Sequence, residues 1–566
     1  MAPSNSLIET FGTWNFSAIV VGFLQALSTV KFPPKKKIFM SGTQETDYLK
    51  LILNARVYDI LQQTPLTKAS NLSNRLGCNI HLKREDLHPV FSFKCRGAYN
   101  FMAHIPTQDR WRGVITCSAG NHAQGVALAG SHLDIPCTIL MPKNTPSIKW
   151  KNVDRLGAKV ILHGDSFDDA KAECFRLAHD LHLTYVPPYD HPYIIAGQGT
   201  AAVELTRQID MSHVDSVFCS VGGGGLISGM SEYIKRIAPD NVKMMGAETL
   251  DGDALSRSIK AGHRVMLDDV GVFSDGTAVR IVGEEPFRIC QQLIDHIQLV
   301  DNDAICAAIK DVFEDTRSIP EPAGALSVAA LKSYIYENNL LNSGKTFVAV
   351  VSGANMNFDR LRFVAERASI GEGRECMLSI TIPDEPGMFV KLHSAIHPLA
   401  VTEFVYRYAD DHPPAHAQDA VIFCSFSLPS ASSSLAPSER QSMIANVITK
   451  IRSLGFDALD VSDNDLAKSH ARYLIGGRSS CTNERLIAFE FPERPNALRK
   501  FLTALNPNWN ISLFHYRNLG GDVSKVLTGI QVPPSDTQAF ETSLNHLGYQ
   551  YVDETENSVY QRFMRF

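Results

Sequence analysis

Apolar runs that end in a glycine-containing turn and continue as a helical pattern recur between residues 45 and 366. The clearest are GVITCSAGNHAQGVALA, which starts at Gly113, and SVFCSVGGGGLISGMSEYI, which starts at Ser216. Strands of a parallel sheet are buried on both faces, so they appear as continuous apolar runs, and helices cover the sheet. The pattern predicts an α/β domain over residues 45–366, with a parallel sheet flanked by helices. Ligands of such sheets bind at the carboxyl ends of the strands, where both glycine turns fall.

Two copies of another pattern follow. CMLSITIPDEPGMFVKLHSAI, from Cys376, and RLIAFEFPERPNALRKFLTAL, from Arg485, each read as an alternating strand, a turn and a helix. The later stretch VTEFVYRY is echoed by ISLFHYRN. Strand, helix, strand and then helix, strand correspond to βαββαβ units. We therefore expect two α+β ferredoxin-type repeats, over residues 375–474 and 484–566, and an N-terminal extension over residues 1–44.

Composition excludes several classes of function. The 566-residue chain is 44% hydrophobic with a formal net charge of −6, and its only dense basic run is Lys35–Lys37. We therefore expect no nucleic-acid partner. The 11 cysteines are scattered, without a CxxC pair or a metal-ligand spacing with histidine. This favours a reducing compartment and argues against a disulfide framework or a metal site.

The N-terminal region leaves the cellular location open. Residues 14–30 are mostly apolar and could form a membrane anchor, but the run is short for a span and contains Asn15 and Gln25. A transit peptide should be rich in arginine and poor in acidic residues. Residues 1–30 instead contain Glu9 and neither lysine nor arginine.

Four consecutive glycines stand between an apolar run and the helical pattern that follows it. At a helix N-terminus, glycines allow the backbone to approach a ligand and to direct N–H groups at an anion such as a phosphate. A flexible turn is the alternative, but it would lose much conformational entropy without gain. The loop lacks the Gly-Lys-Ser/Thr of a Walker motif. The sequence thus predicts a phosphate cup at Gly222, Gly223, Gly224 and Gly225.

The stretch SAGNHAQG forms a second turn before a helix. Exposed N–H groups at Ser118, Ala119 and Gly120 could hold a substrate carboxylate. The Asn121 amide could hydrogen-bond a ligand oxygen. His122 could contact the substrate, or it could be a helix-start histidine whose hydrogen bonds are satisfied within the protein.

Lys94 lies in FSFKCRGA, among apolar and small residues, and Arg96 is its obvious charged neighbour. A lysine that stays charged needs water, whereas a desolvated lysine near a cation loses its proton and becomes a nucleophile. Lys94 is therefore either a surface lysine or a group for covalent chemistry. Together with the tetraglycine and the asparagine turn, it suggests pyridoxal 5′-phosphate held as a Schiff base.

Six stretches carry a resemblance to a known family: KREDLHPVFSFKCRGAYN, SAGNHAQGVA, VPPYDHPYIIAGQGT, VGGGGL, EPAGA and SGANMNFDRLR. On these motifs, residues 46–366 resemble the fold-type II pyridoxal-phosphate enzymes. Residues 46–566 resemble the biosynthetic threonine dehydratases (threonine deaminases), including their two ACT-like regulatory repeats. The set covers most of the chain and is far more specific than any single motif.

The resemblance implies a role for each motif. Lys94 forms the Schiff base and, once released, removes the Cα proton of the substrate. Phe93 packs beside the cofactor ring, and Asn121 hydrogen-bonds its 3′-hydroxyl. The N–H groups of the tetraglycine, with Leu226 after it, bind the phosphate, and Ser352 faces the pyridine nitrogen. A hydroxyl there protonates the ring only weakly, which favours prompt β-elimination over transamination or racemisation.

The reaction that the resemblance implies is deamination of L-threonine to 2-oxobutanoate and ammonia, by a homotetramer, for isoleucine synthesis or another pathway. Proton removal requires a neutral lysine, and desolvation and nearby cations lower the pKa of a lysine. Arg96 is either that cation or a member of a structural salt bridge. The resemblance places the chain in the mitochondrial matrix, or in the cytoplasm if residues 1–44 are not a targeting segment.

Other functions share these motifs. Serine racemases of this fold tend to have a serine where Ala119 stands, and catabolic serine/threonine dehydratases often have a cysteine in place of Ser352 and usually lack the regulatory half. A catalytically dead amino-acid sensor is disfavoured, because the lysine, the asparagine and the tetraglycine are all present. Cys95 and Thr277 replace the usual aliphatic residues, so the preference between threonine and serine stays open.

The regulatory half of the family binds isoleucine, and valine is a second candidate effector. Where many members have an arginine before the VTEF strand, this chain has Leu399, which cannot donate the hydrogen bonds of a guanidinium. Glu403 and Tyr406 are further candidate regulatory residues. The leucine predicts weak or absent inhibition by isoleucine. The alternative is that Leu399 packs on the core of its own repeat while another cation takes over.

Overall fold

The computed structural model describes residues 46–383, 388–399, 401–405, 419–428, 437–473, 482–492, 500–501, 504, 509, 511–516 and 523–565. The apolar run at residues 14–30 and Tyr406 lie outside the described residues. Within the described ranges, no helix is both long enough and apolar enough to cross a membrane.

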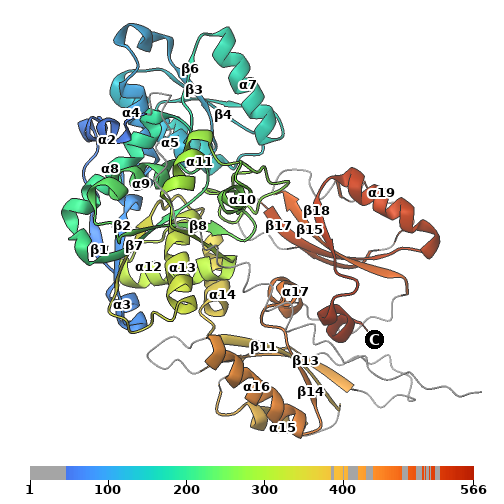
Figure 1. Ribbon diagram of the computed structural model, residues 1–566. Coiled ribbons are helices and arrows are strands. Elements are labelled where there is room, and N and C mark those ends of the chain that lie inside the picture. Colours follow the sequence, from blue (N-terminus) through green and yellow to red (C-terminus); the bar gives the residue numbers. More distant parts are fainter. Residues whose placement is uncertain are drawn as a thin grey trace, which may run out of the picture.

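A six-stranded sheet forms the centre of the larger domain (Figure 1). Its order is β1-β2-β10-β7-β8-β9, and all neighbouring strands are parallel except β1, which pairs antiparallel with β2 at the edge. The strands in this order are β1 (Leu66–Lys68), β2 (Asn79–Arg84), β10 (Thr346–Val351), β7 (Val214–Ser220), β8 (Lys243–Thr249) and β9 (His296–Val300).

Hydrophobic cores lie on both faces of this sheet. Val217 and Val350 join a core that includes residues of α8 (Pro192–Gln208), α9 (Gly225–Ile237) and α11 (Glu284–Leu293). Phe218 and Val351 join a core that includes residues of α3 (Ser70–Leu76), α12 (Asn302–Thr316) and α13 (Pro322–Glu337). Successive strand residues point to opposite faces. The continuous apolar runs in the sequence therefore follow from a sheet that is covered on both sides.

A separate four-stranded parallel sheet, of order β5-β4-β3-β6, carries α5 and α6 on one face and α7 on the other. The predicted parallel architecture is confirmed, but it is divided between two sheets. Alternation of strands and helices predicts the class of fold, not which strands pair. The strands in this order are β5 (Lys159–Leu162), β4 (Cys137–Met141), β3 (Val114–Cys117) and β6 (Thr184–Tyr185).

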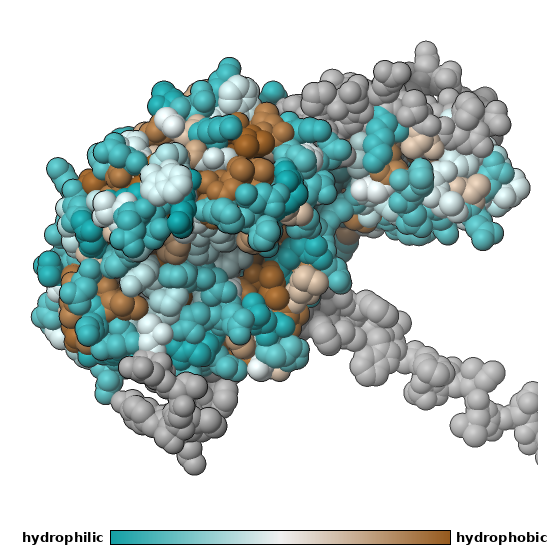
Figure 2. All heavy atoms as spheres, turned by 90° about the horizontal axis from the view of Figure 1, so that it is seen from above, coloured by the Kyte–Doolittle hydropathy of each residue, from teal (hydrophilic) through white to brown (hydrophobic). Residues whose placement is uncertain are grey.

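The helices of this larger domain surround the two sheets (Figure 1). Figure 2 shows that hydrophilic side chains cover most of the described surface on one face, with apolar patches scattered among them. The α-helices are α2 (Tyr48–Leu53), α3 (Ser70–Leu76), α4 (Lys94–Ala103), α5 (Asn121–Leu133), α6 (Ser147–Asp154), α7 (Phe167–Asp180), α8 (Pro192–Gln208), α9 (Gly225–Ile237), α10 (Ala254–Ala261), α11 (Glu284–Leu293), α12 (Asn302–Thr316), α13 (Pro322–Glu337) and α14 (Arg360–Gly371).

Two smaller antiparallel sheets follow, with the same strand order. The first is β12-β13-β11-β14 and the second is β16-β17-β15-β18, so in both the first and third strands are central, as in a ferredoxin-type βαββαβ unit. This confirms the predicted α+β class. The elements are β11 (Glu375–Pro383), α15 (Met388–Ile396), β12 (Val401–Val405), β13 (Asp419–Ser427), α16 (Pro437–Ser453), β14 (Asp457–Asp460), α17 (Asp465–Ser469), β15 (Glu484–Pro492), β16 (Ile511–Tyr516), β17 (Val523–Gln531), α19 (Thr537–Leu547) and β18 (Gln550–Asp553).

The two repeats share one hydrophobic core. Met377 of β11 and Phe423 of β13 belong to the same cluster as Leu486 of β15 and Leu527 of β17. A short π-helix near the C-terminus, η7 (Tyr560–Met564), adds its own apolar side chains to this cluster. The repeats therefore pack against each other through their sheets and the C-terminal segment.

Ion pairs connect the larger domain to both repeats. Asp303, at the start of α12, lies 2.8 Å from Arg367 of α14 and 2.6 Å from Lys468 of α17. Arg367 also lies 2.8 Å from Asp465 of α17, and Asp465 pairs with Lys525 of β17. These five side chains form a continuous chain of alternating charges, which we term the interdomain ion chain.

Four charged side chains form a buried ion cluster behind α4. Arg96 lies 2.6 Å from both Glu85 and Glu204, and Lys83 lies 2.6 Å from Glu204. All four are essentially inaccessible to solvent. Although burial opposes ionisation, Arg96 holds the pKa of Glu85 well below its usual range. The cluster ties together β2, η2 (Glu85–Leu87), α4 and α8.

Removing the guanidinium should destabilise the fold strongly. Arg96→Met leaves two buried carboxylates without their shared guanidinium, with Lys83 beside Glu204 and His88 beside Glu85, so we expect the free energy of unfolding to fall by about 3–5 kcal/mol. Urea denaturation followed by circular dichroism measures it. Arg176→Met is the control: this side chain is 57% exposed and pairs with Glu173 on α7, so its loss should cost less than about 1 kcal/mol. Equal losses would contradict the assigned role of the cluster.

Candidate active site

Lys94 begins α4 and is mostly buried. Its Nζ atom donates a hydrogen bond to the carbonyl oxygen of Pro188 at 2.9 Å. The same atom lies 5.4 Å from the ring centroid of Phe93 and 5.9 Å from that of Tyr189. Two aromatic rings and one carbonyl replace most of the water that a charged ammonium needs.

Burial lowers the pKa of Lys94 to about 8, against an opposing effect of the Glu321 carboxyl. Arg96 is not the cause, because its guanidinium is directed into the buried cluster and held by Glu85 and Glu204. The interpretation of Arg96 as a pKa-lowering cation is therefore wrong, and the salt-bridge alternative is right. Desolvation alone provides the neutral amine.

The tetraglycine joins β7 to α9. Gly224 has φ +90°, a conformation that L side chains rarely adopt, and it precedes the first residue of α9. A Cβ atom at Gly223 would collide with the Tyr189 ring, and one at Gly224 would lie 2.8 Å from Pro286. The absence of side chains therefore lets this loop pack closely, with the N-terminal N–H groups of α9 at its end.

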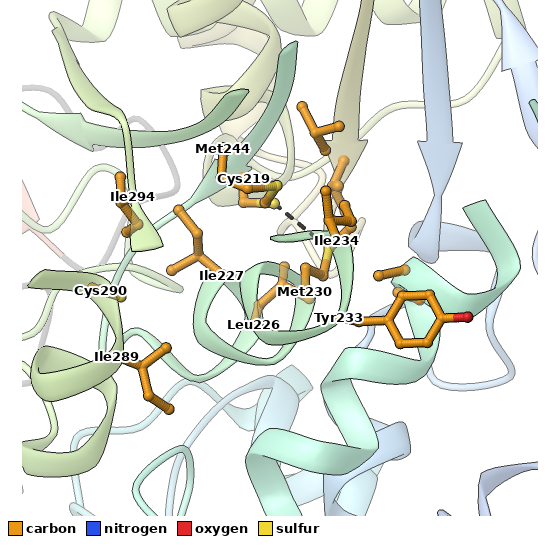
Figure 3. Close-up of a cluster of buried hydrophobic side chains, with 14 of the residues drawn as sticks. Cys219, Leu226, Ile227, Met230, Tyr233, Ile234, Met244, Ile289, Cys290 and Ile294 are labelled. Carbon is orange, nitrogen blue, oxygen red and sulfur yellow. Dashed lines mark hydrogen bonds between the residues drawn. The ribbon is translucent and has the colours of Figure 1, made fainter. Parts of the chain in front are cut away.

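Core packing fixes α9 behind the loop. Figure 3 shows Leu226, Ile227 and Met230 within the hydrophobic cluster around this helix, with Cys219 Sγ 3.6 Å from Met230 Sδ. The Leu226 side chain is thus part of the core, so this residue can offer a phosphate only its backbone N–H.

The turn before α5 places Asn121 opposite two residues from distant parts of the chain. Asn121 Nδ2 donates to Glu321 Oε1 at 2.5 Å, and Asn355 Nδ2 donates to Asn121 Oδ1 at 2.7 Å. Within the turn, the Gly120 N–H donates to Ser118 Oγ at 3.3 Å. Ala119, between them, packs beside the core of the smaller parallel sheet.

His122 is buried and its Nε2 atom lies 3.1 Å from the carbonyl oxygen of Val186. Burial, followed by the nearby Lys94, lowers the pKa of His122 to about 3. The imidazole is therefore neutral. Its contact with the backbone supports the interpretation as a helix-start histidine.

Ser352 follows β10 and is hydrogen-bonded through its backbone to Phe93, the residue before Lys94. Its carbonyl oxygen accepts from the Phe93 N–H at 3.1 Å, and its Oγ donates to the carbonyl oxygen of Ala323 at 3.2 Å. Ser92 and Gly353 form an isolated bridge beside this contact. The sequence-predicted lysine, phenylalanine and serine are therefore brought together.

Sequence reasoning gave no role to Glu321 or Tyr189, and it connected Thr277 only with the preference between threonine and serine. A Cβ at Gly222 would lie 3.0 Å from Thr277 Cα, so the loop around Thr277 adjoins the tetraglycine. These residues lie in the EPAGA, VPPYDHPY and SDGTAVR stretches, but the residues that they contact in the fold are remote in sequence. Cys95 packs instead in a separate small core with Val57 and other apolar residues.

Two of the regulatory candidates, Leu399 and Glu403, are among the described residues of the first repeat. Leu399 packs against the core of that repeat. Glu403 lies on β12, where its backbone is opposite Ser425 of β13.

The residues around Lys94 fit pyridoxal 5′-phosphate. A lysine whose pKa is lowered to about 8 can present a neutral amine to an aldehyde, and the tetraglycine forms a cradle that side chains would fill. Ser220 Oγ, at the end of β7, and Ser92 Oγ are buried without a hydrogen-bond partner among the described residues. Such polar atoms are expected where a polar ligand binds.

Two family models match the chain. One, described as "Pyridoxal-phosphate dependent enzyme", matches residues 57–353. The other, described as "C-terminal regulatory domain of Threonine dehydratase", matches residues 366–471 and 476–564. Together they span both parallel sheets and both repeats.

Individual proteins agree. The mitochondrial threonine dehydratase of Saccharomyces cerevisiae is 52% identical over 545 residues, covering 95% of this chain and 93% of that protein. The solved structure of processed threonine deaminase isoform 2 from Solanum lycopersicum is 44% identical with a TM-score of 0.56, covering 60% of this chain and 99% of that one. Maize serine racemase is 28% identical with a TM-score of 0.52, covering 56% and 98%. The chain therefore belongs to the threonine dehydratase family of pyridoxal-phosphate-dependent enzymes.

Proposed function

We propose that this chain converts L-threonine to 2-oxobutanoate and ammonia, with pyridoxal 5′-phosphate bound through Lys94. The observation that carries the proposal is the desolvated amine of Lys94, whose pKa is about 8, beside a glycine loop at a helix N-terminus. A lysine that is partly neutral near physiological pH can act both as nucleophile and as base.

The chain offers a distinct contact to each part of the cofactor. The N–H groups at residues 222–226 would bind the phosphate, and the Asn121 amide would hydrogen-bond the ring oxygen. Ser352 would face the ring nitrogen with a hydroxyl that does not ionise in the physiological range. Phe93 and Tyr189, whose rings flank the lysine, would exclude water.

The chemistry supplied by the bound cofactor is stabilisation of negative charge at the substrate Cα. Lys94, released as a neutral amine, removes the Cα proton and holds it at Nζ, close to the carbonyl oxygen of Pro188. The turn at Ser118, Ala119 and Gly120 would hold the substrate carboxylate. Loss of the β-hydroxyl as water and hydrolysis of the released enamine give the two products.

Racemisation and serine deamination are the two alternative activities of this fold. Racemisation needs a proton donor on the opposite face of the cofactor, and Ala119 supplies none. Serine deamination uses the same steps as threonine deamination, so turnover of both amino acids by the purified protein decides between them. A mitochondrial location and a homotetramer are further parts of the proposal, the first supported by the name of the yeast relative.

Loss of the amine should abolish the reaction without unfolding the protein. We expect Lys94→Ala to reduce 2-oxobutanoate formation by at least about a thousandfold, because no neighbouring group supplies both the covalent link and the base. A dehydrogenase-coupled assay measures the ketoacid. Lys151→Ala, which removes an exposed lysine of α6, should retain activity. A substantial residual rate in the first variant would refute the role of Lys94.

The pKa of Lys94 predicts the pH dependence of cofactor loading. Only the neutral amine attacks the aldehyde, so the association rate of the apoprotein with pyridoxal phosphate should rise with pH, with a midpoint at pH about 8, and then level off. Stopped-flow absorbance between pH 7 and 10 measures the rate. A midpoint near the ordinary lysine value would show that the amine is solvated, and the Lys94→Ala protein should show no such phase.

We further propose that isoleucine regulates this chain weakly, because the side chain of Leu399 offers no hydrogen-bond donor where many members of the family have an arginine. Leu399→Arg should then lower the isoleucine concentration for half-inhibition by roughly 2- to 30-fold, the equivalent of ~0.5–2 kcal/mol of coupling. Met443→Arg, which places an arginine beside the same core, is the matched control. Strong cooperative inhibition of the native protein, unchanged by Leu399→Arg, would refute this proposal. A parallel titration with valine tests the second candidate effector.

A further inference from the structure

Asn121 is held at both ends of its side-chain amide. Nδ2 donates to Glu321 Oε1, and Oδ1 accepts from Asn355 Nδ2, which also donates to the carbonyl oxygen of Val90 at 2.8 Å. An amide has its donors on one atom and its acceptor on the other, so these partners fix which way it points. One N–H of Nδ2 is used by Glu321, and the other meets no acceptor among the described residues.

Glu321 is itself rigidly placed. It precedes α13, its backbone N–H donates to the carbonyl oxygen of Gly353 at 3.1 Å, and it is 97% buried, with 3% of its surface exposed. Its carboxylate packs so closely on Gly353 that a Cβ there would collide with Oε1. A Cβ at Gly276 would lie 3.7 Å from the same oxygen, which is an ordinary contact distance. The carboxylate therefore has little freedom to leave Asn121.

The charges around Glu321 come from several elements. Burial and then the charge of Asp275 raise the pKa of Glu321, the Asn121 hydrogen bond, Lys149 and Arg360 oppose this rise, and the net pKa is about 7. Asp275 lies 2.8 Å from Lys149 and 3.8 Å from Arg360, so its own charge is largely balanced. Glu321 in turn raises the pKa of Lys94.

We propose that Glu321 is a positioning residue, whose Oε1 atom fixes the Asn121 amide so that the second N–H of Nδ2 is presented to an oxygen of the bound cofactor. The inference rests on the proposed function of this pocket. It assigns Glu321 a role through Asn121, not a contact with the reacting atoms. A hydrogen bond from an amide to a carboxylate is stronger than one to a neutral acceptor, which suits an orienting role.

A double-mutant cycle on cofactor affinity tests the proposal. Apoprotein is titrated with pyridoxal phosphate and the bound fraction is followed by absorbance. We expect Glu321→Ala and Asn121→Ala each to weaken affinity about tenfold, and the double variant to be no weaker than either single variant, because both remove the same oriented N–H. Losses that multiply to about a hundredfold, or no loss in Glu321→Ala, would overturn it.

Two further variants separate positioning from stability. Glu321→Gln keeps the shape and an acceptor oxygen, so it should fold and recover part of the lost affinity. Glu337→Gln removes an exposed carboxylate at the last residue of α13, one that accepts from Gln298, and should leave affinity unchanged. Equal losses in Glu321→Gln and Glu337→Gln would show a structural effect only and overturn the proposal.

The pH dependence gives an independent readout. The carboxylate is the stronger acceptor and prevails above pH about 7. The affinity advantage of the native protein over Glu321→Gln should therefore grow between pH 6 and 8, and a constant ratio would overturn the proposal. The proposed function itself fails if the native protein does not bind pyridoxal phosphate saturably, or if Lys94→Ala binds it equally well. If the native protein binds the cofactor but the affinity losses of Glu321→Ala and Asn121→Ala multiply in the double variant, only the proposed role of Glu321 fails.

Discussion

The active site depends on the ion pairs that the buried guanidinium of Arg96 makes with Glu85 and Glu204. Arg96 stands two residues after Lys94, and Glu85 and Glu204 hold it from η2 and α8. The segment that enters α8 also carries Pro188, whose carbonyl contacts the lysine amine. The same buried cluster thus positions the start of α4, which carries Lys94, and the segment before α8, which carries Pro188. Desolvation offsets much of the Coulombic gain of such a cluster, but its charges admit few alternative arrangements.

Positive charge near the reacting amine is either balanced or absent. Arg96 and Lys83 are balanced by Glu85 and Glu204, and the imidazole of His122 is neutral. The amine therefore loses its proton through lack of water and not through repulsion. A pocket of this kind leaves the phosphate and carboxylate of its ligands to be met by backbone N–H groups, whose partial charges cost no ionisation.

Local patterns predicted most of the fold and part of the site. The lysine, the tetraglycine and both repeats follow from short-range signals: an apolar context, glycines before a helix, and an echo of one strand pattern in another. Pairing across long distances was not predictable in this way. Glu321 lies 200 residues from Asn121, and the destination of the Arg96 side chain depends on Glu204 of α8. A single sequence records which groups exist, and only the fold determines which of them meet.

The interdomain ion chain has unequal protection along its length. Asp303 and Arg367 are almost fully buried, whereas Asp465 and Lys525 are 49% and 43% exposed. Dissolved salt screens exposed pairs much more than buried ones. As ionic strength rises, the ion pair of Asp465 with Lys525 of the second repeat weakens first, while the ion pair of Asp303 with Lys468 of the first repeat persists. At high salt the second repeat is therefore held mainly by the hydrophobic core that it shares with the first repeat, while the first repeat keeps its buried ionic contact with the domain that carries Lys94.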